Sequence, residues 1–304
     1  MDTPPPAALR GAARPRERVR GRTPAGLVLL AALALSPSAC VPRYDANAGA
    51  GPNANAATPA AGPARPGAAK SEDKGDFKVA RREPDEDGLS AEERAELDDE
   101  EKSLEEAAAE LNKAFSLPHD ILIGFDECEE PNAFYDPEKK EVVVCYQLVE
   151  DLYESYRGEY KSDEEIEEVV GNATTFVFFH EVGHALIDAY DLPVTGREED
   201  AVDQLSVLVL ADGSEEGDRT VLDAARTFSR ATDAELDELA FADEHSLDRQ
   251  RFYNIICLLY GQNRQKFASL VEDGTLPEGR AERCGDEYAR AQKAWDALLA
   301  PYVK

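Results

Sequence analysis

The chain has 304 residues, and its 63 acidic side chains outnumber the 33 basic ones to give a formal net charge of −30. A surface this acidic repels nucleic acid and anionic lipid headgroups, so we expect no nucleic-acid partner. Residues 85–304 are numerous enough for one domain with its own hydrophobic core.

Residues 1–39 are typical of an export signal. Arginine dominates the charges of the first part, and an apolar run follows at 26–35. This run is too short to span a bilayer but matches the core of a secretory signal. It leads to Ser38-Ala39-Cys40, which resembles a bacterial lipoprotein signal whose cysteine becomes the lipidated first residue. We therefore expect an exported protein, either secreted or a cell-envelope lipoprotein tethered to the membrane by a lipid anchor on Cys40.

Residues 40–84 are rich in Ala, Pro and Gly and then in charged side chains. They hold too few large apolar residues to bury a core, so we expect a disordered linker. The domain predicted for 85–304 begins with an acidic helix over 90–115. Its leucines recur at helical spacing, and Ser90 is suited to cap its N-terminus.

The cysteines indicate two disulfides. If Cys40 carries a lipid, four of the five cysteines remain, and four allow three pairings. A hairpin is predicted from a strand at 120–123, a turn at 136–140 and a returning strand at 142–144. Cys128 and Cys145 flank this hairpin, whereas Cys257 and Cys284 lie on the last helices, so we predict these two local pairs. Such bridges agree with export into an oxidising compartment.

The sequence His180-Glu181-Val182-Gly183-His184 is the strongest functional signal. It lies in a helix predicted for 164–190, where residues four apart share one face, so both imidazoles can hold one zinc ion. Glu181 lies next to that ion, where it can act as general base and take a proton from water. The alternative is a helix with two ordinary, partly buried histidines. The apolar run at 174–179 argues for the metal, because a buried helix must satisfy such polar groups.

A zinc hydrolase needs a third protein ligand and one open position. An extended three-histidine pattern would require histidine at position 190, where the chain has Tyr190. A carboxylate from the helix predicted for 197–211 is therefore expected. Glu199 and Asp203 are one turn apart, so Glu199 can bind the metal while Asp203 orients a ligand histidine. Glu198 remains the alternative third ligand, because it lies nearer the centre of that helix's apolar stripe.

These two pieces, HEVGH at 180–184 and EDAVD at 199–203, resemble the zinc site of the gluzincin metallopeptidases. From about residue 117 onward the chain resembles more closely a bacterial family of putative metallopeptidases, DUF4344. The second resemblance rests on the following segments: PNAFY at 131–135, CY at 145–146, REED at 197–200, DEHSL at 243–247 and QRFYN at 250–254. It implies that one zinc ion supports hydrolysis of a peptide or protein substrate.

Other candidate residues come from the rest of the chain. His245 and Tyr253 are predicted to share one face of a helix over 243–260, where they could stabilise the oxyanion of the transition state. Arg249 and Arg251 are the next candidates for this role. The segment 142–147 is a candidate edge strand for binding the substrate backbone, with Asn132 and Tyr135 near the cleft.

The expected fold is α+β and predominantly helical, a zincin-like metallopeptidase domain with a small sheet packed on the His-Glu-x-x-His helix. Further helices are predicted at 219–230, 263–272 and 279–299. A different class of protein stays open, namely a surface-anchored zinc-binding interaction module without turnover. The presence of Glu181 argues against it, because a structural zinc site has no use for a base.

Overall fold

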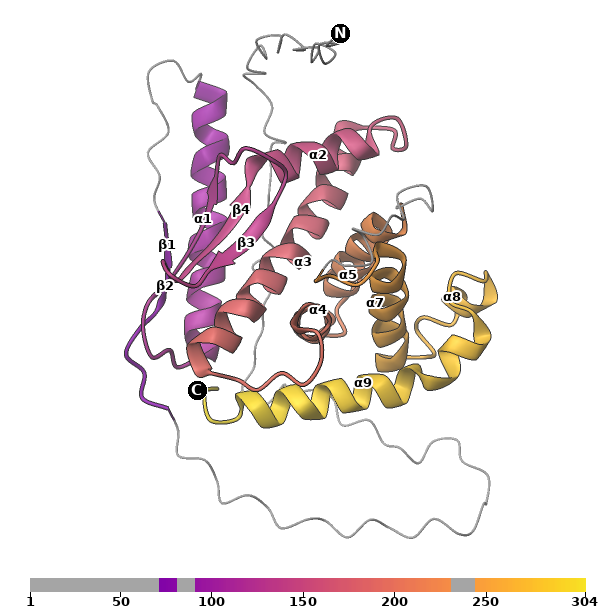
Figure 1. Cartoon of the computed structure of the whole chain (residues 1–304). Helices are drawn as coiled ribbons and strands as arrows, with labels where there is room; N and C mark the ends of the chain where they lie inside the picture. The colour runs from indigo at the N-terminus through magenta and orange to yellow at the C-terminus, as the bar shows by residue number, and fades with distance from the viewer. Residues whose placement is uncertain (1–70, 81–90, 231–243) are drawn as a thin grey trace, which may run out of the picture.

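The computed structural model describes residues 71–80, 91–230 and 244–304. The predicted signal, Cys40, most of the predicted linker and the cap at Ser90 lie outside these residues. The described elements form a predominantly helical α+β structure with a four-stranded mixed sheet (Figure 1). This agrees with the fold class predicted from the sequence.

The sheet has the strand order β1-β2-β4-β3. Its strands are β1 (Phe77–Val79), β2 (Ile121–Asp126), β3 (Ala133–Asp136) and β4 (Glu141–Cys145). β1, β2 and β4 are parallel, and only β3 is antiparallel to its neighbour β4.

Three predictions about this region are wrong. The strand predicted at 120–123 does pair with 142–144, but in parallel, and the hairpin partner of β4 is β3. The proposed edge strand at 142–147 is central, because β4 lies between β2 and β3 and all its residues are buried. β1 lies inside the predicted linker, yet it pairs with β2. The β1–β2 and β2–β4 pairings join segments that are not adjacent in the chain, whereas β3 and β4 form a local hairpin.

Eight helices are described, and the sequence missed one of them, α2. Their bounds are α1 (Ala91–Ala114), α2 (Tyr146–Tyr156), α3 (Asp163–Tyr190), α4 (Glu198–Leu210), α5 (Glu215–Ser229), α7 (Asp248–Gln262), α8 (Ser269–Glu272) and α9 (Glu278–Leu299). The predicted helix at 243–260 begins five residues later than expected, at Asp248. The helix predicted at 263–272 is reduced to the single turn of α8.

Helix α3 begins and ends at clear signals. The Ser162 side chain accepts a hydrogen bond from the Glu165 amide at 3.3 Å, which caps one of the free donors of the first turn. Acidic residues occupy that first turn, at the positive end of the helix dipole. The helix ends at Asp191, which adopts the left-handed conformation with φ of 49°.

Helix α3 is central to the domain because it is packed on both sides. It contacts β3, β4 and α2 on one side and α4 and α5 on the other, while α1 packs against β1 and β2 (Figure 1). Its middle turns are buried at nearly every position, as the apolar run at 174–179 predicted. The His-Glu-x-x-His sequence therefore lies inside the protein and must find polar partners there.

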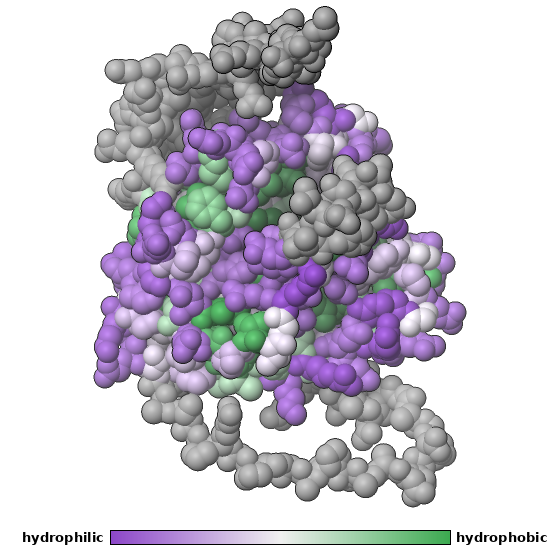
Figure 2. Space-filling model, in the orientation of Figure 1, coloured by the Kyte–Doolittle hydropathy of each residue, from purple (hydrophilic) through white to green (hydrophobic). Residues whose placement is uncertain are grey.

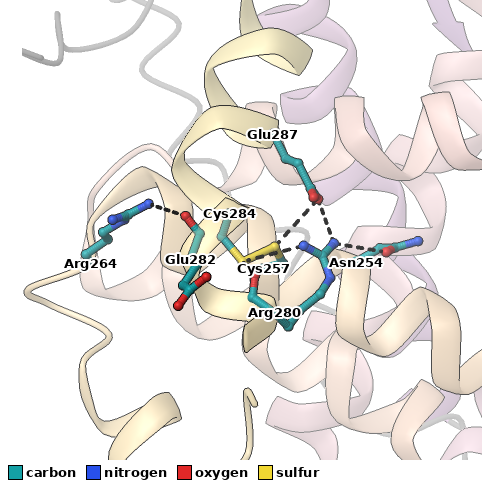
Figure 3. The surroundings of a disulfide bond; sticks show 7 residues. All are labelled: Asn254, Cys257, Arg264, Arg280, Glu282, Cys284 and Glu287. Carbon is teal, nitrogen blue, oxygen red and sulfur yellow. Dashed lines mark hydrogen bonds and ion pairs between the residues drawn. A yellow bond between two sulfur atoms is a disulfide. The ribbon is translucent and has the colours of Figure 1, made fainter. Parts of the chain in front are cut away.

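Both predicted disulfides are present. Cys128, just after β2, is bonded to Cys145 at the end of β4. Cys257 of α7 is bonded to Cys284 of α9, where Arg280 lies beside the bridge (Figure 3). The two long helices α7 and α9 are thus covalently joined.

Polar side chains cover most of one face of the described structure. The face drawn in Figure 2 is mainly hydrophilic, with small apolar areas between the polar side chains. None of the helices in the described ranges combines the length and the apolar character needed to cross a membrane.

Candidate metal centre

The two histidines of α3 point their Nε2 atoms at each other. These atoms are 3.3 Å apart, and the rings lie edge to face with centroids 5.0 Å apart. Both side chains project from one helix face because they are four residues apart. His180 is buried and His184 is partly exposed.

Glu199 faces both histidines from the first turn of α4. Its Oε2 is 3.0 Å from Nε2 of His180, and its Oε1 is 3.3 Å from Nε2 of His184. One ligand atom from each of the three residues lies within 4.8 Å of the others. A tetrahedral zinc ion with bonds of about 2.0 Å requires its ligand atoms to be about 3.3 Å apart. The three residues therefore fit such an ion.

The close packing of α3 on α4 brings Glu199 to this position. A Cβ atom added to Gly183 would lie 2.7 Å from Cγ1 and 2.8 Å from Cβ of Val202. Only glycine permits the two helices to approach this closely.

Each histidine also binds a carboxylate through its other nitrogen. Nδ1 of His180 is 2.8 Å from Oδ1 of Asp203, and Nδ1 of His184 is 2.8 Å from Oε1 of Glu198. With Nδ1 as the donor, each ring keeps the Nε2 lone pair for a metal. Asp203 thus lies where the sequence placed it. Glu198, the alternative third ligand, lies on the outer side of His184.

Arg251 of α7 completes the contacts of Asp203. Its Nε is 2.8 Å from Oδ2, and its Nη2 is 2.8 Å from Oδ1, in a two-pronged ion pair. Burial alone raises the pKa of Asp203, but the hydrogen bond from His180 and the charge of Arg251 hold it below its ordinary value. Asp203 is therefore an anion despite its burial.

The histidines and Glu199 shift one another's pKa values through their hydrogen bonds. Burial alone lowers the pKa of His184, but its bonds to Glu199 and Glu198 raise it to about 9. Burial alone raises the pKa of Glu199, but its contacts with His180, His184 and His245 hold it well below the ordinary value. The cluster thus retains protons, which a bound cation would replace.

Glu181 lies in the same cluster but is not committed to a partner. It is buried, and this burial raises the pKa of its carboxyl above the ordinary value. No side chain or amide of the described residues donates a hydrogen bond to this carboxylate. A buried carboxylate beside the histidines is therefore available to accept a proton.

His245 reaches the site from the segment before α7. Its Nε2 is 2.9 Å from Oε2 of Glu199, and its ring is stacked on that of His180 at 6.1 Å. Arg197 donates a hydrogen bond to the His245 carbonyl at 2.6 Å, which fixes the segment next to α4. The prediction that His245 shares a helix face with Tyr253 is wrong, because α7 begins only at Asp248.

Tyr253 lies apart from the histidines. Its ring packs edge to face on Phe252, and it lines a surface pocket of about 500 Å³ together with Asp200, Ser246, Gln250, Asn254, Pro277 and Arg280. The Ser246 hydroxyl donates to Asp200 at 2.7 Å, so this pocket begins one residue from both His245 and Glu199.

The side chains of Asn132 and Tyr135 form hydrogen bonds with residues outside the histidine cluster. The Asn132 side chain accepts a hydrogen bond from the Ala133 amide, as in a turn. The Tyr135 hydroxyl donates to Asp188 at 2.7 Å and so fastens β3 to the last turn of α3.

A buried His-Glu-x-x-His helix that faces a glutamate of a second helix is the ligand arrangement of zinc hydrolases. The sequence also matches the model of the DUF4344 family, described as putative metallopeptidase, over residues 84–299, and the chain belongs to this family. Neither a curated protein nor a solved structure matches the chain.

Proposed function

We propose that the protein is a zinc-dependent, gluzincin-like peptidase that hydrolyses a peptide or protein substrate. The observation that carries the proposal is the triangle of His180, His184 and Glu199, whose edges of 3.0 to 3.3 Å match one tetrahedral ion. These three residues would hold the ion and leave its fourth position to solvent. Zinc bound in this way would lower the pKa of a bound water to about 7 and would polarise a carbonyl oxygen.

Glu181 is the general base in this proposal. Its carboxylate accepts a proton from the attacking water and then donates that proton to the nitrogen of the leaving amine. Both the burial of Glu181 and the absence of a committed partner among the described residues support the assignment. The raised pKa of this carboxyl brings it closer to neutral pH, where proton acceptance and release are both favourable.

His245 is our candidate for stabilising the oxyanion. Its side chain is 41% exposed, and its Nε2 lies beside Glu199, so its imidazole would lie next to the carbonyl of a substrate bound at the proposed metal. Tyr253 is proposed to contact the substrate in the adjoining pocket. The edge strand β3, rather than the central β4, is the strand that an extended substrate could join by backbone pairing.

We further propose that the protein is exported and tethered by a lipid on Cys40. Two disulfides within the domain support export, because such bridges persist in oxidising compartments. The anchor rests on the Ser-Ala-Cys sequence at 38–40.

The function is tested by comparing the native chain with a Glu181→Gln variant. Both proteins should bind one equivalent of zinc by elemental analysis, because Glu181 is not a ligand. Cleavage of a mixed peptide library, followed by mass spectrometry, should fall at least about 100-fold in the variant, since a positioned base contributes about 10²–10⁴-fold. Equal amounts of zinc without cleavage by either protein would support the binding module instead. A native chain that binds no zinc would refute the metal site.

A further inference from the structure

Arg251 is the one basic side chain among the described residues that forms a two-pronged ion pair with the carboxylate behind His180. Its side chain is only 12% exposed, and Asp203 is 8% exposed. The guanidinium also lies over the ring of Phe228, 4.0 Å from its centroid. Arg251 is thus fixed by contacts with both α4 and α5.

The pairing leaves Asp203 a single orientation. Arg251 occupies one lone pair on each carboxylate oxygen, and Oδ1 offers its other lone pair to Nδ1 of His180. A two-pronged guanidinium contact fixes the plane of a carboxylate as well as its position. The direction in which His180 points its Nε2 is therefore set by Arg251 through Asp203.

Arg251 belongs to a helix that is held in place at its other end. Six residues further along α7, Cys257 is bonded to Cys284 of α9. On α9, Arg280 donates to Asn254 of α7 at 3.3 Å and to Glu287 at 2.6 Å (Figure 3). Since α7 is joined to α9 in this way, the guanidinium cannot simply follow a displaced carboxylate.

We propose that Arg251 is a positioning residue for the metal centre, which acts through Asp203 on His180 and thereby raises the affinity for zinc. This inference rests on the zinc site of the proposed function. Among the described residues, the guanidinium of Arg251 donates its hydrogen bonds to Asp203 and to none of the three proposed ligands. An ion pair that merely joined α7 to α4 would affect stability and leave the zinc affinity of the folded protein unchanged.

The test measures zinc affinity directly, by competition with a chromophoric chelator and without any substrate. Arg251→Met should weaken zinc binding about 10- to 100-fold, the usual effect of losing a residue that orients a ligand. Arg251→Lys, which keeps the charge but loses the fork, should give an intermediate loss. The control is Arg283→Met, which removes an exposed arginine of α9 and should bind zinc like the native chain.

A double-mutant cycle shows whether Arg251 acts through Asp203. In an Asp203→Asn background, Arg251→Met should weaken zinc binding by less than about threefold, because the carboxylate that it orients is already gone. Arg251→Lys keeps a positive charge beside the buried Asp203, so its zinc affinity carries the test if Arg251→Met alone does not fold. Circular dichroism of the zinc-free proteins establishes folding in each case.

Two results would overturn the inference. One is native zinc affinity in a folded Arg251→Met variant. The other is an equal loss on removing Arg251 with and without Asp203, which would mean that the arginine acts by another route. Failure of the native chain to bind zinc is a different outcome, because it refutes the proposed function before any variant is compared.

Discussion

The glycine inside the His-Glu-x-x-His sequence provides a sensitive test of the packing that forms the site. In a Gly183→Ala variant, the new methyl carbon would lie 2.7 Å from Cγ1 of Val202. Carbon atoms in contact are about 3.5–4.0 Å apart, so α3 and α4 must separate by about 1 Å. Glu199 is three residues before Val202 on α4 and moves with it. Metal–ligand distances tolerate deviations of about 0.2 Å, so zinc binding should weaken as well.

The overpacking cost of Gly183→Ala can be separated from the stability that alanine adds through its higher helix propensity. Gly171 lies on the same helix, and a Cβ atom added there would have no neighbour within 4 Å. Replacing it with alanine should stabilise the protein by about 0.8–1.0 kcal/mol, the difference in helix propensity. Gly183→Ala receives the same gain but also an overpacking cost of about 1–3 kcal/mol. The difference between the two variants therefore isolates the overpacking.

The measurement is urea unfolding of the zinc-free proteins, with both disulfides intact. At equal m-values, the midpoint of Gly183→Ala should lie below that of Gly171→Ala by an amount equivalent to about 1–3 kcal/mol. Chelator competition then compares zinc affinity, which should fall only in Gly183→Ala. If Gly183→Ala is as stable as Gly171→Ala and binds zinc like the native chain, the close approach of α3 and α4 is refuted.

Two further predictions concern the disulfides and the N-terminal segment. The bridges close loops with separations of 17 and 27 residues, so replacing both cysteines of a pair with alanine should lower the free energy of unfolding by about 3.1 kcal/mol for Cys128–Cys145 and about 3.6 kcal/mol for Cys257–Cys284. Urea unfolding measures both losses, and losses below about 1 kcal/mol would contradict the chain-entropy reasoning. Cys40→Ser in the full-length chain should move the protein from the membrane pellet to the soluble fraction of an expressing bacterium, whereas a native chain that is already soluble would exclude the anchor.

The predicted and observed structures agree best where local signals decide the structure. The bounds of α3 and α4 were predicted to within about a residue, because capping residues and helical periodicity are both encoded locally. The spacing of Glu199 and Asp203 likewise requires only one turn of helix. The sheet was predicted less well, because a short apolar run does not show whether its partner strand is parallel or antiparallel.

The positions of the remaining site residues depend on contacts between distant segments. Arg251 lies 48 residues after Asp203, and its residue type alone does not show which carboxylate it will meet. The signal in the sequence was the position of Arg251 four residues before Ile255, on the side of α7 that faces the core. An arginine buried there requires an anionic partner. His245 was expected at the site on a helix. It does lie beside Glu199, but in the non-helical segment before α7.

Asp203 and Glu198, the two carboxylates bonded to Nδ1 of the histidines, differ in their exposure to solvent. This difference explains how the site can be both rigid and open. Asp203 is almost fully buried and is fixed by Arg251, so His180 is held from within the protein. Glu198 is 44% exposed, so the bond that orients His184 is accessible to water. An exposed pair contributes little to orientation, whereas a buried one with a charged partner contributes much more. The buried side therefore fixes the geometry of the proposed metal site, and the exposed side, near His184, is open to solvent and is the side on which we expect the proposed substrate to enter.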